Sequence, residues 1–312
     1  MSYAVVLGEA LIDLLETERD GELIYRQAIG GAPLNVSVGA TRLGGDVRFA
    51  GSLSDDILGD RIAQFLRKVD VGVQAVKRVP VPTTLAVTTF EGAEPTFTFY
   101  GEPPSYALFT PEDVDHDLVA DAAVVYAGSI CLMREPFQSA ARAAWAVPGP
   151  IKVFDPNVRP KLLPDAAAVT ALRDLVEDFF ATADLVKLSS ADAEVLYDGA
   201  SPAAAAERIH KIGARSVVVT CGSKGAYVHA PDGSSMLPAP TVAAIDATGA
   251  GDSVMGALVR RLLADGLPDD LAGWQRHVRF ALAVAGLVCE RRGGAVAMPT
   301  TAELTERWGA LI

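Results

Sequence analysis

Apolar residues along the chain fall into short runs that predict buried strands. The clearest runs are Ala4–Leu7, Val124–Ala127, Ile151–Phe154, Leu185–Leu188 and Ser216–Thr220. Runs that are apolar almost throughout are typical of strands covered on both faces, as in a parallel sheet. Segments with helical periodicity lie between them, such as Asp60–Val69, where apolar residues recur at i, i+3, i+4 and i+7. This alternation predicts one doubly wound α/β domain over residues 1–312, with a mainly parallel sheet flanked by helices.

Two segments break the alternation and predict a second, small sheet. Ala10–Ile29 reads as a hairpin around Arg19-Asp20-Gly21, and Thr83–Tyr100 alternates and turns at Glu91–Pro95. Neither contains the helical crossover that joins parallel strands. We therefore expect residues of about 10–29 and 83–103 to form an antiparallel sheet that projects from the core. Such a sheet is either an extra edge or a lid over a ligand.

Composition and charge exclude several classes of partner. The chain has 312 residues, with 27 Lys and Arg against 39 Asp and Glu, a net charge of −12. This balance argues against nucleic acid and against an anionic membrane surface, because both require clustered basic residues. The longest apolar run, Phe280–Cys289, falls well short of the ~20 residues that span a bilayer. We expect neither nucleic acid nor membrane as a partner.

Cysteine and histidine usage points to a reducing compartment. Cys131, Cys221 and Cys289 are far apart, which excludes a disulfide framework and a CxxC site. The four histidines lack the spacing of a zinc site. The start of the chain has no basic segment followed by an uninterrupted apolar run, so we expect no signal peptide and a cytoplasmic protein.

The strongest local signal is a turn of small residues, Asp246-Ala247-Thr248-Gly249-Ala250-Gly251-Asp252, that precedes an apolar helix ending at Gly266. Small residues at a helix N-terminus let a ligand approach the main-chain N–H groups, which favour an anion. Asp252 is either a simple helix cap or a proton acceptor beside this anion cradle. Phosphoryl transfer to a hydroxyl needs that combination. The GxxxxGK[ST], GxGxxG and GxSxG patterns of other nucleotide-binding and hydrolase folds are absent.

This turn resembles the C-terminal signature of the ribokinase-like (PfkB) carbohydrate kinases. Gly30-Gly31-Ala32-Pro33-Leu34-Asn35-Val36 resembles their N-terminal signature. Gly8-Glu9-Ala10-Leu11-Ile12-Asp13 and Asp155-Pro156-Asn157-Val158-Arg159 are similar to the fructokinase branch. The resemblance implies a ribokinase-like fold with a β-sheet lid. It also implies an ATP-dependent sugar kinase that uses Mg²⁺ and, in some members, a monovalent cation such as K⁺.

The resemblance also assigns roles to individual residues. The catalytic set is Asp252 as base, Gly249, Ala250 and Gly251 as anion hole, and Arg159 on the transferred phosphate. The sugar-binding set is Asp13, Gly30, Gly31 and Asn35. The nucleotide set is Lys187, Ser189, Thr220, Gly222 and Gly225. Asp192 is the expected Mg²⁺ residue, and Asp246 with Thr248 the expected monovalent-cation site.

Several of these residues are unusual on their own. Asp13 is polar in an apolar stretch, so it either meets a sugar hydroxyl or faces solvent from a strand. Asn35 lies inside a helix that Gly30 and Gly31 precede, where asparagine has poor propensity. Arg159 follows the strand Ile151–Phe154, at the carboxyl end where open α/β sheets bind ligands; the alternative is a solvated loop arginine. Thr220–Gly225 is either a phosphate loop or a plain hairpin turn.

Two departures from the family pattern bear on metal and substrate. Ser189 and Asp192 stand where Asn and Glu are common, so Mg²⁺ would be held through water. Gly101 follows Tyr100 where related kinases often carry an arginine, which disfavours a 2-keto-3-deoxygluconate substrate. Fructose is the first candidate; another sugar, a nucleoside, or a catalytically silent sugar sensor are the alternatives. Exposed edges of the small sheet make a homodimer through the lid a further expectation.

Overall fold

The computed structural model describes residues 2–91 and 94–309, and within them the side chains outside 90–97. A nine-stranded sheet forms the body, in the order β13-β12-β11-β10-β9-β8-β1-β4-β5. Its strands are β1 (Tyr3–Leu7), β4 (Asp46–Ser54), β5 (Gly72–Val79), β8 (Val124–Gly128), β9 (Ile151–Asp155), β10 (Leu185–Ser189), β11 (Ser216–Thr220), β12 (Ala226–Ala230) and β13 (Gly233–Leu237). Neighbours run parallel from β5 to β11, and β12 and β13 add an antiparallel hairpin at one edge. The five predicted strands and the mainly parallel sheet are confirmed.

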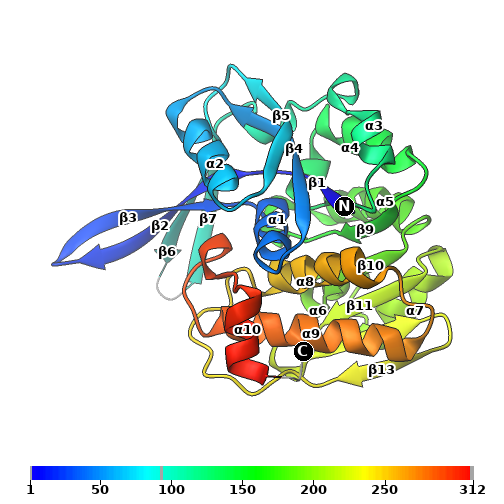
Figure 1. Ribbon diagram of the computed structural model, residues 1–312. Coiled ribbons are helices and arrows are strands. Elements are labelled where there is room, and N and C mark those ends of the chain that lie inside the picture. Colours follow the sequence, from blue (N-terminus) through cyan, green and yellow to red (C-terminus); the bar gives the residue numbers. More distant parts are fainter. Residues whose placement is uncertain (1, 92–93, 310–312) are drawn as a thin grey trace.

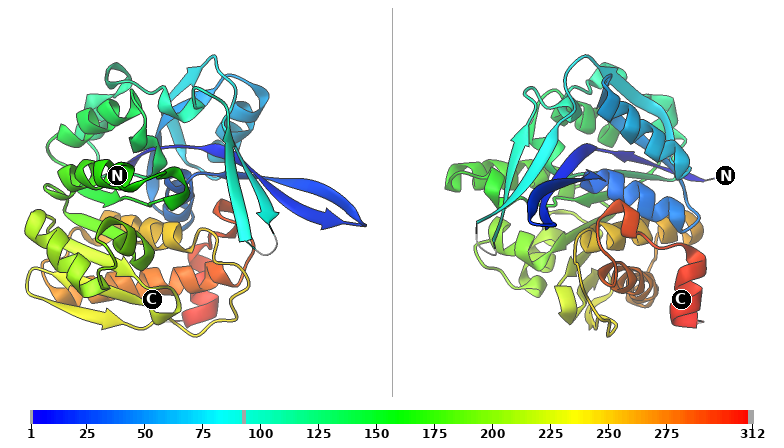
Figure 2. Two further views of the ribbon diagram at one scale, coloured as in Figure 1. Left: turned by 180° about the vertical axis from the view of Figure 1, so that it is seen from behind. Right: turned by 90° about the vertical axis from the view of Figure 1, so that its left-hand side faces the viewer.

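Helices cover both faces of this sheet (Figure 1). One face carries α1 (Ala32–Arg42), α2 (Ile57–Lys68), α8 (Ala250–Asp265) and α9 (Leu271–Cys289), with α10 (Thr301–Trp308) against α9. The other, seen from behind in Figure 2, carries α3 (His116–Ala120), α4 (Phe137–Ala146), α5 (Ala166–Phe180), α6 (Ser190–Leu196) and α7 (Pro202–Ile212). In α2, Ile62 and Leu66 of the predicted stripe are buried, and Ser201 caps α7 as its sequence indicates.

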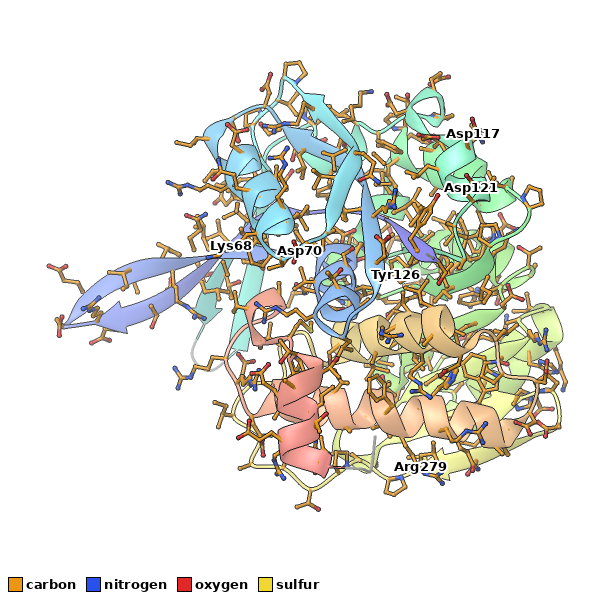
Figure 3. All side chains as sticks on the ribbon, viewed as in Figure 1. Lys68, Asp70, Asp117, Asp121, Tyr126 and Arg279 are labelled. Atoms are coloured by element: carbon orange, nitrogen blue, oxygen red, sulfur yellow. The ribbon has the colours of Figure 1, made fainter. Side chains whose placement is uncertain are left out.

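Side chains fill the space between the sheet and the helices (Figure 3). Tyr126, labelled there, is fully buried on β8, whereas the labelled Asp117 and Arg279 are exposed at the surface. The face under α8 and α9 packs alternate residues of β1 and β8, such as Val6 and Val124, and the opposite face packs Val5 and Val125. This two-sided burial explains why the central strands are apolar throughout. None of the described helices is long and apolar enough to cross a membrane.

A separate four-stranded sheet projects from the body, in the order β3-β2-β6-β7 (Figures 1 and 2). It consists of two antiparallel hairpins, β2 (Leu11–Arg19) with β3 (Glu22–Gly30) and β6 (Leu85–Glu91) with β7 (Glu94–Tyr100). The first hairpin turns at Asp20 and Gly21, whose positive φ angles of 55° and 80° suit an Asp-Gly turn. The second predicted turn, Glu91–Pro95, includes residues 92–93, outside the described part of the chain.

The predicted small sheet is therefore confirmed, with one difference in its pairing. The two hairpins meet through β2 and β6, which run parallel. The sequence predicts a fully antiparallel sheet because neither segment contains a helical crossover. The connection between β2 and β6 is in fact long: it passes through β3, α1, β4, α2 and β5. The chain thus enters the small sheet directly after β1 and leaves it directly before α1.

Candidate active site

Two cavities lie on either side of the N-terminus of α8. Cavity A, of about 460 Å³, is lined by Glu9, Leu11, Asp13, Gly31, Ala32, Asn35, Ala86, Phe99, Ser129, Ile130, Arg159, Pro160, Lys161, Leu162, Thr248, Gly249 and Asp252. Cavity B, of about 540 Å³, is lined by Thr220, Gly222, Ser223, Gly225, Ala239, Pro240, Thr241, Val242, Ala244, Ala247, Ala250, Gly251, Val254, Leu282, Ala285, Gly286 and Cys289. The turn at the start of α8 contributes residues to both, so it forms the wall between them.

Cavity A opens at the point where the chain reverses its direction across the sheet. From β1 the sheet grows one way through β4 and β5, and from β8 it grows the other way through β9, β10 and β11. Glu9 follows β1 and Ser129 follows β8, so both lie at the carboxyl ends of these two adjacent strands. In open α/β sheets, ligands bind in the crevice at such a switch point.

Asp252 lies in the first turn of α8, with its carboxylate in cavity A. Its Oδ2 accepts a hydrogen bond of 2.7 Å from Nδ2 of Asn35 on α1. The two helices approach closely because Gly256 has no side chain; a Cβ there would lie 3.0 Å from the Val36 carbonyl oxygen. Asn35 is buried, which explains a residue of poor helix propensity in this position. The Asn35 contact thus fixes the orientation of the Asp252 carboxylate.

Asp13 faces cavity A from β2, so it is not a solvent-facing strand residue. Its carboxylate lies across Gly30 of the paired strand β3, at a place where a Cβ would overlap it. Burial raises the pKa of Asp13 to about 6, although the Arg159 guanidinium partly opposes this. Burying a carboxylate in this way costs free energy unless hydrogen-bond donors compensate it.

Gly31 begins α1 with a φ of 112°, in the region that only glycine adopts readily. A Cβ there would meet the Glu9 carbonyl oxygen at 2.5 Å.

Gly101 has a φ of 104°, and a Cβ added to it would lie 3.3 Å from Cα of Thr84. The backbone conformation at this position suits glycine and would strain an arginine.

Lys187 and Asp155 form a buried ion pair beneath the turn. Their Nζ and Oδ2 atoms are 2.8 Å apart, and both side chains are almost completely buried. A Cβ on Gly251 would lie 3.2 Å from this Nζ. Burial alone would lower the pKa of Lys187, but the Asp155 carboxylate outweighs it and raises that pKa. The ammonium group therefore stays charged close to the Gly249–Gly251 turn, although it lines neither cavity.

The side chains of Ser189 and Asp192 cap the N-terminus of α6. Ser189 Oγ accepts the Asp192 N–H at 3.0 Å, and Asp192 Oδ2 accepts the Ser189 N–H at 2.7 Å. Asp192 Oδ1 accepts the Val158 N–H at 3.0 Å. Both carboxylate oxygens are thus engaged by the main chain, and neither residue lines either cavity. A water-mediated metal contact is compatible with this arrangement, and the Mg²⁺ role of Asp192 stays a prediction.

Asp246 and Thr248 shape the turn before α8. Asp246 Oδ1 accepts the Thr248 N–H at 2.8 Å, and Oδ2 accepts the Gly293 N–H at 2.9 Å. Burial raises the pKa of Asp246, but these hydrogen bonds outweigh it and lower the pKa overall. In the described residues, no group of three or more His, Cys, Asp and Glu side chains is arranged to hold a metal. The monovalent-cation role of this pair stays a prediction.

The structure thus brings together most of the predicted residues. Cavity A collects Asp13, Gly31, Asn35, Arg159, Thr248, Gly249 and Asp252. Cavity B collects Thr220, Gly222, Gly225, Ala250 and Gly251. The segment Thr220–Gly225 is also the connection of the β11–β12 hairpin, so its two interpretations are compatible. Gly30 lies behind Asp13, and Lys187, Ser189, Asp192 and Asp246 support the site from outside the cavities.

Sequence reasoning missed two groups of lining residues. Glu9, Phe99 and Ser129 line cavity A. Glu9 carries a signal in the sequence, since it is an acidic residue in an otherwise apolar stretch, but that signal alone does not distinguish a ligand site from an interrupted strand. In cavity B the missed wall is apolar: Pro240, Val242, Leu282, Ala285, Gly286 and Cys289. Apolar residues on α9 are indistinguishable in sequence from core positions, so no pattern marks them as ligand contacts.

Comparison with known proteins agrees with this geometry. The probable fructokinase-2 of Arabidopsis thaliana is 32% identical over 96% of this chain and 93% of its own length. The structure of a Xylella fastidiosa fructokinase with bound ATP superposes with a TM-score of 0.89, at 28% identity over 97% of both chains. That of a Vibrio cholerae O395 fructokinase with fructose, ADP and calcium superposes with a TM-score of 0.86, at 30% identity over 98% of both.

The sequence model of the pfkB family of carbohydrate kinases matches residues 1–301, nearly the whole chain. Both predicted signatures lie within that range, one at the start of α1 and one at the start of α8. The sequence match and the shared fold together show that the chain belongs to the pfkB family of carbohydrate kinases.

Proposed function

We propose that this sugar kinase transfers the γ-phosphate of ATP to a hydroxyl of fructose, and that transfer takes place at the N-terminus of α8. The observation that carries the proposal is the position of the α8 turn between two cavities. Thr248, Gly249 and Asp252 face cavity A, whereas Ala250 and Gly251 face cavity B. A hydroxyl in one cavity and a terminal phosphate in the other would meet at this wall.

The side chains that line the two cavities support this placement of the substrates. Cavity A contains the carboxylates of Asp13 and Asp252, the amide of Asn35 and the guanidinium of Arg159, a set suited to a polyol. Cavity B joins the glycine-rich turn Thr220–Gly225 to an apolar wall from α9, which suits phosphates at one end and a flat base at the other. The fructose and ADP in the Vibrio cholerae relative support this assignment.

Asp252 acts as the base in this proposal. Its carboxylate, held by Asn35, orients the attacking hydroxyl and takes its proton, while the turn amides and the Lys187 ammonium stabilise the charge on the transferred group. Arg159 contributes further donors from the lining of cavity A. Mg²⁺ would supply charge neutralisation on the nucleotide phosphates, held mainly by them and by water near Asp192.

The small sheet acts as the lid of a single domain in this account. Leu11 and Asp13 of β2, Ala86 of β6 and Phe99 of β7 all line cavity A. A sheet that supplies one wall of a substrate cavity excludes water when it closes, which limits hydrolysis of ATP. Leu23, Tyr25 and Tyr100 are exposed on the same sheet, and covering them favours a homodimer through the lid.

A coupled ADP-release assay across a panel of sugars and nucleosides tests the proposed function. We expect ADP release to depend on added sugar and to be fastest with fructose, with Mg²⁺ present. Faster turnover of another sugar or a nucleoside would correct the substrate. Binding of fructose and ATP without any turnover would instead identify a silent sugar sensor and overturn the proposal.

Fructose binding in the absence of nucleotide should weaken as the pH falls through the pKa of Asp13, about 6. The carboxylate accepts hydrogen bonds from sugar hydroxyls, and its anionic fraction falls roughly tenfold between pH 7 and pH 5. We therefore expect the dissociation constant from calorimetry to rise by about that factor over this range. The Asp13→Asn variant should bind weakly with a flat profile; a parent profile equally flat would contradict the contact.

A further inference from the structure

Glu9 has a buried carboxyl group to which the proposed reaction gives no role. The side chain is 2% exposed, although the residue lines cavity A. Its Oε1 accepts a 2.6 Å hydrogen bond from Ser129 Oγ and a 3.3 Å one from the Ala32 N–H. Oε2 is buried and has no nitrogen or oxygen partner among the described residues, although the Cys131 thiol interacts with this carboxyl group. A buried carboxyl group that is half satisfied destabilises the fold, so its presence indicates a functional demand.

Ser129, the partner of Glu9, holds a strained backbone conformation. Its φ of 71° and ψ of −169° are sparsely populated for a residue other than glycine, and such a conformation costs about 1–3 kcal/mol. Two contacts hold it in place: its N–H donates to the Asp155 carbonyl oxygen at 3.1 Å, and its hydroxyl donates to Glu9. Glu9 therefore fixes the turn that follows β8.

The same turn connects to Arg159 through Asn157. Asn157 Nδ2 donates to Ser129 Oγ at 3.4 Å, the weakest link, and the Asn157 N–H donates to Asp155 Oδ1 at 3.0 Å. Asn157 also has a positive φ, 43°. Its Oδ1 accepts a 2.6 Å hydrogen bond from Arg159 Nη1. A continuous chain of contacts thus runs from the end of β1, across β8 and β9, to the guanidinium in cavity A.

We propose that Glu9 is a positioning residue that acts through Ser129 and Asn157 to set the place of the Arg159 guanidinium for phosphoryl transfer. This inference rests on the proposed kinase reaction. The contact with Ala32 gives Glu9 a second effect, on the start of α1, whereas the Ser129 hydroxyl links Glu9 to Asn157 and so to Arg159. Displacing Arg159 by about 1 Å would lower kcat by up to about 10²-fold and leave the KM for sugar nearly unchanged.

The test measures four single variants: Glu9→Ala, Glu9→Gln, Ser129→Gly and Arg159→Ala. Each of the first three is also combined with Arg159→Ala. Glycine accepts the backbone angles of Ser129, so Ser129→Gly removes the hydroxymethyl side chain without straining the turn. We expect Glu9→Ala and Ser129→Gly to lower kcat about 10- to 100-fold, and Glu9→Gln, which keeps an acceptor oxygen, to restore most of it. In the Arg159→Ala background, Ser129→Gly should change kcat less than twofold, whereas Glu9→Ala keeps the effect that it has through Ala32. Glu18→Gln, an exposed carboxylate on β2, is the matched control, and thermal unfolding checks each variant's fold.

The outcomes separate this inference from the function beneath it. A parent protein that phosphorylates no member of the panel defeats the proposed function and the inference with it. With an active parent, the inference fails if Arg159→Ala has no effect on kcat. It also fails if Ser129→Gly turns over like the parent, or if its loss persists undiminished in the Arg159→Ala background. If Glu9→Ala does not fold, Ser129→Gly still decides between these results.

Discussion

The Asp252→Asn variant should phosphorylate fructose about 10²–10⁴-fold more slowly than the parent, with ATP affinity nearly unchanged. Asparagine keeps the size of the side chain and an oxygen that accepts the 2.7 Å hydrogen bond from Asn35. What it loses is the negative charge and the ability to accept the proton of the attacking hydroxyl. Steady-state ADP release gives kcat, and calorimetry gives the dissociation constant for ATP.

The matched control is Asp70→Asn, which makes the same chemical change at a residue that lines neither cavity. Asp70 has a φ of 61°, a conformation that asparagine tolerates, and it is exposed just after the C-terminus of α2 (Figure 3). Its kcat should equal that of the parent. Turnover by Asp252→Asn within a few-fold of the parent would remove Asp252 from the role of base.

Replacing Lys187 with methionine should destabilise the fold by about 3–5 kcal/mol. The change leaves the Asp155 carboxylate buried without its 2.8 Å partner, and both side chains are almost fully buried. Urea unfolding at pH 7, followed by circular dichroism, measures the free energy of unfolding.

The double variant Asp155→Asn with Lys187→Met is the control for this prediction. It removes the uncompensated charge, so most of the lost stability should return. It should not recover kinase activity, because the positive charge of the Lys187 ammonium beneath the Gly249–Gly251 turn is still missing. A loss below about 1 kcal/mol in the single variant would show that Asp155 does not depend on this lysine.

The layered fold was predictable because its signals are local. The strand from Ser216 to Thr220 is buried on both faces, and this burial makes its sequence continuously apolar. The Asp20-Gly21 turn, the Ser201 cap and the ends of α8 each follow from the backbone angles that their residues favour. No local sequence signal indicates the parallel pairing of β2 with β6, because it joins segments separated by two helices and three strands.

The candidate site was predictable only where its chemistry required unusual residues. Asp252 and the small residues before it stood out because the proposed anion site needs exposed main-chain amides. The apolar wall of cavity B did not, since Leu282 and Ala285 have the pattern of core residues on α9. The buried contacts of Glu9 and Lys187 depend on which strand ends are neighbours, and a single sequence does not reveal that order.

The most direct test of the central claim is a crystal structure of the Asp252→Asn variant with fructose and ATP, in which slow turnover preserves both substrates. The account predicts the sugar in cavity A with one hydroxyl against residue 252. It predicts the adenine base of ATP in cavity B and the γ-phosphate at the amides of Gly249–Gly251. A nucleotide bound outside cavity B, or a sugar whose hydroxyls all point away from residue 252, would contradict it.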